Sequence, residues 1–198
     1  MRAKQNLFTK TAILMLIVLL QISCKPLLKT YLKTTGNLKK AKKETPASVI
    51  AYLKKQNATY DGAFVCQDKK GFRYFQDSVS NAIPSVLIFD KNFTNFVLDE
   101  KCPWSILPGL DSLNNSTYWK KNNDLSFQKM TAQLKTIDGA FINYPETGTY
   151  DVYVFYVWAK YAPKLSQAII KEIKEYFNNP HNNIYVGSVN RDLQEGWE

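Results

Sequence analysis

The chain has 198 residues, of which 26 are Lys or Arg and 17 are Asp or Glu, so its formal net charge is +9. Three basic residues precede residue 11 and seven more lie between residues 24 and 43, which leaves 16 basic against 17 acidic side chains from Glu44 onward. The main part of the chain is almost neutral, so the overall charge does not indicate a nucleic-acid-binding domain. The length suits one domain with a packed core.

The first 23 residues have the composition of a secretory signal. Three basic residues come first, an apolar run follows from Ala12 to Leu20, and the small Ser23 precedes Cys24. The uncharged stretch is shorter than the ~20 residues of a membrane-spanning helix, which favours a cleaved signal over a transmembrane anchor.

This segment resembles the lipobox of bacterial lipoproteins, although Gln21 stands where Leu is usual. The resemblance implies that residues 1–23 are removed and that Cys24 carries fatty acids such as palmitate. It also implies a place on the periplasmic side of a Gram-negative envelope membrane. An ordinary secretory signal with an unrelated cysteine is the alternative.

Residues 24–44 form a Lys-rich segment, with seven lysines and no acidic residue before Glu44. Near an anionic membrane each lysine contributes about 1 kcal/mol of attraction. We therefore expect a membrane tether that adds to the hold of the lipid, followed by a domain over residues 45–198. The alternative is a solvated spacer without specific contacts.

Two cysteines remain beside Cys24. In an oxidising compartment Cys66 and Cys102 are candidates for a disulfide bridge. A redox pair or a reactive thiol is the functional alternative, and two buried thiols that never meet are the other. Sequence does not give the Cα separation that decides between them.

The first half of the domain reads as a helix followed by strands. Thr45 caps a helix that starts with Pro46, since a hydroxyl and then a proline are typical of a helix start. The predicted elements are helix Pro46–Gln56, a hairpin of strands Gly62–Gln67 and Phe72–Gln76 around a turn at Lys69–Gly71, and antiparallel strands Ser85–Asp90 and Asn95–Leu98.

The second half contains a predicted β-α-β unit. Asp124 caps a helix through Phe127, Met130 and Leu134. Strand Asp151–Ala159 is hydrophobic without alternation, which is typical of a central strand buried on both faces. An amphipathic helix starts at Pro163, with Leu165, Ala168, Ile169, Ile173 and Phe177 on its apolar side, and strand Ile184–Val189 follows; the two strands are predicted to be parallel.

This unit resembles the first half of a thioredoxin-like domain, in which a hydrophobic strand ends in Trp-Ala-x-Trp-Cys-x-x-Cys before a long helix. The matching stretch is Trp158–Leu165, and the following strand ends with Val-Asn-Arg-Asp at 189–192. A second stretch, Ile83–Asn92, is similar to the cis-proline segment of that family, with Pro84 as the cis-proline candidate. The resemblance implies an α/β fold with a central mixed sheet flanked by helices.

The sequence departs from the family's pattern in two respects. Ala162 and Leu165 stand at the positions of the redox cysteines, so the thiol chemistry of the family has no nucleophile here. The cis-proline strand precedes the strand that would carry the redox motif, which is the reverse of the family's order. The fold is then either permuted or built from two partial α/β motifs, unless one similarity is accidental.

The resulting hypothesis is a non-enzymatic lipoprotein whose thioredoxin-like domain binds a protein or peptide, with Trp158 and Tyr161 as candidate binding residues. One alternative is a thiol–disulfide oxidoreductase that uses Cys66 and Cys102. Another is a structural envelope component. The chain has a single histidine, His181, and no short-spaced His/Cys cluster, so we expect neither a metal nor another cofactor.

Overall fold

The structure is a computed structural model, and it describes residues 38–79, 82–98, 119–138, 148–177 and 183–197. Residues 1–38 and 39–198 form two compact units, and the second contains the described elements. The lipidation candidate Cys24 and the disulfide candidate Cys102 lie outside the described residues.

A seven-stranded mixed sheet organises the second unit, in the order β5-β4-β3-β7-β8-β2-β6. The central strand β7 runs antiparallel to β3 and parallel to β8, which is in turn parallel to β2. The predicted α/β fold is confirmed and is consistent with a thioredoxin-like fold. The strands are β2 (Gly62–Cys66), β3 (Ser85–Asp90), β4 (Asn95–Leu98), β5 (Trp119–Asn122), β6 (Leu134–Thr136), β7 (Val152–Trp158) and β8 (Ile184–Asn190).

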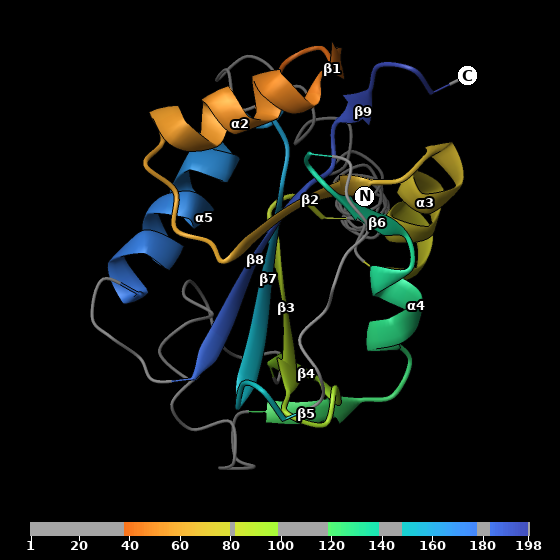
Figure 1. Cartoon of the computed structure of the whole chain (residues 1–198), viewed down its shortest axis with the longest axis vertical. Coiled ribbons are helices and arrows are strands. Elements are labelled where there is room, and N and C mark those ends of the chain that lie inside the picture. Colours follow the sequence, from red (N-terminus) through yellow and green to blue (C-terminus); the bar gives the residue numbers. More distant parts are fainter. Residues whose placement is uncertain (1–37, 80–81, 99–118, 139–147, 178–182, 198) are drawn as a thin grey trace, which may run out of the picture. The chain divides into compact units, whose positions relative to one another are not determined.

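Every residue of β7 is buried, as its sequence predicts, because helices cover both faces of the sheet. Alternate side chains of a strand point to opposite faces. Val154, Tyr156 and Trp158 pack with residues of helices α2 (Pro46–Lys55) and α5 (Pro163–Tyr176). Tyr153, Phe155 and Val157 belong to a second cluster with Phe75, Phe127 and Met130. Figure 1 shows α2 and α5 on one side of the sheet and α3 (Lys69–Tyr74) and α4 (Phe127–Thr131) on the other.

The start of α2 matches the prediction. The Thr45 hydroxyl accepts the N–H of Ser48, and the Ser48 hydroxyl accepts the N–H of Thr45, which makes a reciprocal capping box. In α5 the buried face differs from the predicted one, because Ala168 is exposed and Ser166 and Ile170 are buried.

The hairpin predicted between Gly62 and Gln76 is wrong. Helix α3 and the π-helix η1 (Phe75–Val79) replace its turn and second strand. The Asp68 carboxylate accepts the N–H of Gly71 at 2.7 Å, so an N-cap starts a helix where a turn was expected. Similarly, Ser126 rather than Asp124 caps α4, and Leu134 lies in β6.

A second, two-stranded sheet was not predicted. Strand β1 (Lys43–Glu44) pairs in parallel with β9 (Leu193–Gln194), and the N–H of Lys39 donates to the carbonyl of Tyr161 at 2.6 Å. The last part of the predicted tether therefore belongs to the compact unit, which begins at Lys39.

Candidate functional site

The two segments that resemble thioredoxin motifs are neighbours in the sheet although their order along the chain is reversed. Strands β3 and β7 are antiparallel, with Ser85 opposite Val157. The preceding peptide bond, between Ile83 and Pro84, is cis, as the sequence predicts. The register brings Pro84 to the end of β7, beside the turn that leads into α5.

That turn is built around Ser166, which is fully buried. Its hydroxyl accepts the N–H of Ala159 at 3.1 Å and donates to the carbonyl of Ala159 at 2.8 Å. Ala162, at the N-cap of α5, is fully buried, and Leu165 is half-buried on the first turn. The two positions that the resemblance aligns with redox cysteines thus carry a methyl group and an isobutyl group.

Trp158 lies beneath this turn rather than at the surface. Its side chain is 0% exposed, its Nε1 donates to the Ser188 hydroxyl at 2.8 Å, and its ring stacks on Tyr52 with centroids 5.0 Å apart. The predicted role of Trp158 as a ligand-contacting residue does not fit this burial. Instead, Trp158 supports Tyr52 from the core.

A cavity of about 560 Å³ opens over the start of α5, and we call it the α5-start cleft. The predicted binding residue Tyr161 lines it, whereas Trp158 does not. Its other walls come from the chain before α2, from Tyr52 on α2 and from residues that flank the turn. The lining residues are Lys39, Lys40, Lys42, Lys43, Glu44, Tyr52, Lys160, Tyr161 and Pro163.

The charge of the α5-start cleft is strongly positive. Glu44 is its one carboxylate among the described lining residues; it pairs with Lys160 and accepts the Ser48 hydroxyl at 2.6 Å. Burial by itself raises the pKa of Glu44, but the hydrogen bonds from Lys160 and Ser48 hold it below its ordinary value. The ion pair leaves the positive charge of the remaining lysines uncompensated within the cleft.

The Val-Asn-Arg-Asp segment positions the other side of the turn. Asp192 is 2% exposed, and its Oδ2 accepts the backbone N–H of Lys160 and the Nδ2 of Asn190, each at 2.7 Å. Burial raises the pKa of Asp192 despite these hydrogen bonds. The buried carboxylate thereby fixes the backbone from which Lys160 and Tyr161 reach the cleft.

Cys66 lies at the end of β2 and is a free thiol with 1% exposure. Burial raises its pKa to about 12, so the thiolate required for exchange chemistry is scarce at neutral pH. Cys102 lies outside the described residues, and because Cys66 is free, the predicted bridge between the two is not found in the structure.

In the described part of the chain no group of three or more His, Cys, Asp or Glu side chains is placed to hold a metal ion. Nor does any described helix have the length and apolar character needed to cross a membrane. Comparison with protein-family models, with curated proteins and with solved structures gives no match.

Proposed function

We propose that this protein is a lipid-anchored envelope protein whose thioredoxin-like domain binds an acidic protein or peptide segment in the α5-start cleft, without thiol chemistry. The observation that carries the proposal is the turn at the start of α5. It lies beside the cis-proline that precedes β3, yet Ala162 is buried and Leu165 is apolar where redox cysteines would stand.

The composition of the cleft supports an acidic partner. Its lysines are donors of charged hydrogen bonds, and Tyr52 and Tyr161 add flat surfaces with polar tips. Complementary charge increases both the association rate and the specificity of binding. A carboxylate-rich segment satisfies these donors better than a neutral or basic one.

The absence of thiol chemistry is tested by insulin reduction with dithiothreitol as the electron source. We expect no catalysis by the native protein, because Cys66 is only 1% exposed and burial raises the pKa of its thiol. Catalysis by the native protein that disappears in Cys66→Ala would overturn the proposal in favour of an oxidoreductase that uses Cys66 and Cys102. The burial of Cys66 argues against that alternative.

Binding is tested by fluorescence anisotropy with a labelled oligoglutamate peptide. Exposed ion pairs contribute up to about 1 kcal/mol each, so the double variant Lys42→Gln, Lys43→Gln is expected to weaken binding up to about 25-fold. The matched control is Lys171→Gln, Lys174→Gln on α5, outside the cleft. Equal affinities for the two double variants would exclude the α5-start cleft as the site.

The anchor is tested by the intact mass of the protein extracted from its native membrane. A mass equal to residues 24–198 plus a diacyl or triacyl group supports lipidation at Cys24 and the account of the Lys-rich tether. An unprocessed chain would remove the proposed location but leave the binding proposal in place.

A further inference from the structure

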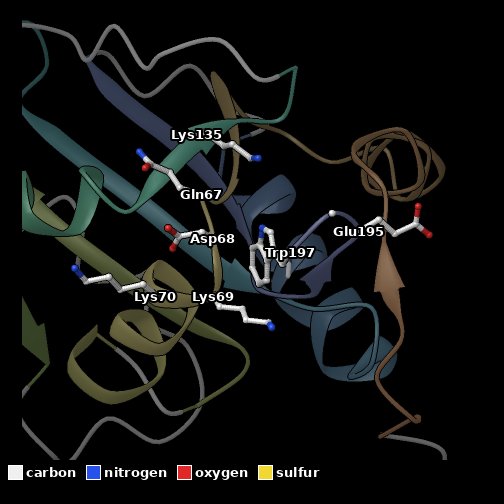
Figure 2. Close-up of a pocket in the computed structure, with 8 residues that line it drawn as sticks. Gln67, Asp68, Lys69, Lys70, Lys135, Glu195 and Trp197 are labelled. Carbon is white, nitrogen blue, oxygen red and sulfur yellow. The ribbon is translucent and has the colours of Figure 1, made fainter.

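A second cavity, of about 620 Å³, shares no lining residue with the α5-start cleft. Figure 2 shows its walls, which come from the end of β2 and the start of α3, from β6 and from the chain after β9. We call it the Trp197 cavity. Its lining residues are Gln67, Asp68, Lys69, Lys70, Lys135, Glu195, Gly196 and Trp197.

The tryptophan in this wall is docked against the body of the domain. Trp197 is 8% exposed, and its ring packs against Phe72 with centroids 5.9 Å apart. Gly196 has a φ of +81°, a conformation that side chains other than glycine rarely adopt, and it turns the chain so that the indole faces inward. In the view of Figure 2 the indole stands between Lys135 and Lys69.

The indole nitrogen of Trp197 is buried and has no hydrogen-bond partner among the residues that the structure describes. A buried donor without an acceptor is costly, and most such donors in folded proteins are satisfied. Packing against Phe72 requires only an aromatic ring, and phenylalanine would supply one without this cost. The N–H therefore points to an acceptor that the described part of the chain does not supply.

The other polar groups of the cavity restrict what that acceptor is. Lys69, Lys70 and Lys135 outnumber Asp68 and Glu195 by one charge, and the Oδ1 of Asp68 already accepts the N–H of Gly71. Ammonium and indole N–H groups are donors only, so the ligand has to supply acceptors. An excess of one positive charge matches a monoanion better than a dianion.

We propose that the Trp197 cavity binds a carboxylate group, one oxygen of which accepts the indole N–H of Trp197 while Lys135 balances its charge. The nitrogen is shielded in the structure, so the proposed hydrogen bond requires the wall of the cavity to move. The source of the carboxylate is either a free organic acid or the C-terminus of a peptide.

The test is a titration of the ¹⁵N-labelled full chain with acetate, at ionic strength held constant with chloride and observed through the indole N–H signals. The chain has four tryptophans, and Trp197→Phe identifies the signal of interest. We expect a saturable downfield shift of the Trp197 signal. The signal of Trp158 is expected to stay in place, because its N–H is already bonded to Ser188.

Lys135→Gln is expected to weaken acetate binding about fivefold, and Lys171→Gln on α5 to leave it unchanged. A peptide with a free C-terminus that binds more tightly than its amidated form assigns the source to a peptide, whereas equal weak binding of both forms assigns it to a free acid. The proposal is overturned if acetate gives no saturable shift, if all four signals drift together, or if inorganic phosphate binds more tightly. Lys42→Gln, Lys43→Gln should not alter the titration, so failure here is distinguishable from failure of the α5-start cleft.

Discussion

Replacing Ser166 by alanine tests the structure of the turn that carries the α5-start cleft. The substitution removes a single oxygen atom that bonds to both backbone groups of Ala159. The carbonyl of Ala159 also accepts the N–H of Ala162 at 3.1 Å and so keeps one partner in the variant. The N–H of Ala159 loses the acceptor that Ser166 provides, inside a region where Ala159 is 0% exposed.

A buried donor left without an acceptor costs about 1–3 kcal/mol. We therefore expect Ser166→Ala to lower the free energy of unfolding by about 2 kcal/mol, which for a domain of this size lowers Tm by about 4–8 °C. In urea the midpoint should fall by about 1 M, measured by circular dichroism. The control is Ser78→Ala, at an exposed position, where a change below about 0.5 kcal/mol is expected. If the two variants lose equally little stability, the N–H of Ala159 has another acceptor and the reasoning is refuted.

Three further variants test other parts of the structure. Gly187→Ala places a Cβ 2.3 Å from the Cδ1 of the buried Phe155, so it should cost about 1–3 kcal/mol in the same urea assay. Adding Phe155→Leu to this variant should restore part of the lost stability. If it restores none, the contact with the Phe155 ring is not the cause of the loss. Burial raises the pKa of Asp192 above its ordinary 3.8, so the native state holds that proton more tightly than the unfolded state. The stability of the native protein relative to Asp192→Asn should therefore fall as pH rises above 3.8, and a difference that is constant from about pH 3 to about pH 7 would exclude this linkage. Glu44→Gln should accelerate trypsin cleavage after Lys42 and Lys43, because the carboxylate binds this segment to Lys160 and Ser48. An unchanged cleavage rate would show that pairing of β1 with β9 is sufficient to hold it.

The elements with strong local patterns could be predicted from the sequence. The unbroken apolar and aromatic run of β7 indicates a central strand, and the structure places helices on both of its faces. The start of α2 follows from a threonine and a proline. The edge strands β5 and β6 were missed because Trp-Lys-Lys-Asn and Leu-Lys-Thr are short and mostly polar. Pairing with a neighbour, rather than propensity, makes them strands.

The wrong hairpin has a more specific cause. The alternation of Phe72, Tyr74 and Gln76 suggested a strand, but the Asp68 cap starts a helix whose aromatic side chains pack into the core instead. An aspartate three residues before a glycine was the signal that could have indicated this start. A local capping hydrogen bond outweighed a weak period-2 pattern.

In the candidate sites, too, residues within one contiguous motif could be predicted, whereas residues brought together by tertiary contacts could not. Tyr161 and the start of α5 were found because they lie within one contiguous motif. Tyr52 and the lysines of residues 39–43 were missed as parts of the α5-start cleft, since they reach it through the pairing of β1 with β9. The Trp197 cavity combines three segments that are far apart in the sequence, and no motif connects them.

The strand order also determines when the sheet can close during synthesis. Strands β7 and β8 occupy the middle of the sheet, but they are made after β2, β3, β4, β5 and β6. Until they emerge, β3 with its partners and β2 with β6 are two half-sheets whose inner edges lack their neighbours. Unpaired edges of this kind are prone to aggregation. A nascent chain that ends before Val152 therefore presents two such edges. The β7-α5-β8 unit covers both edges when it is added, because β7 pairs with β3 and β8 pairs with β2.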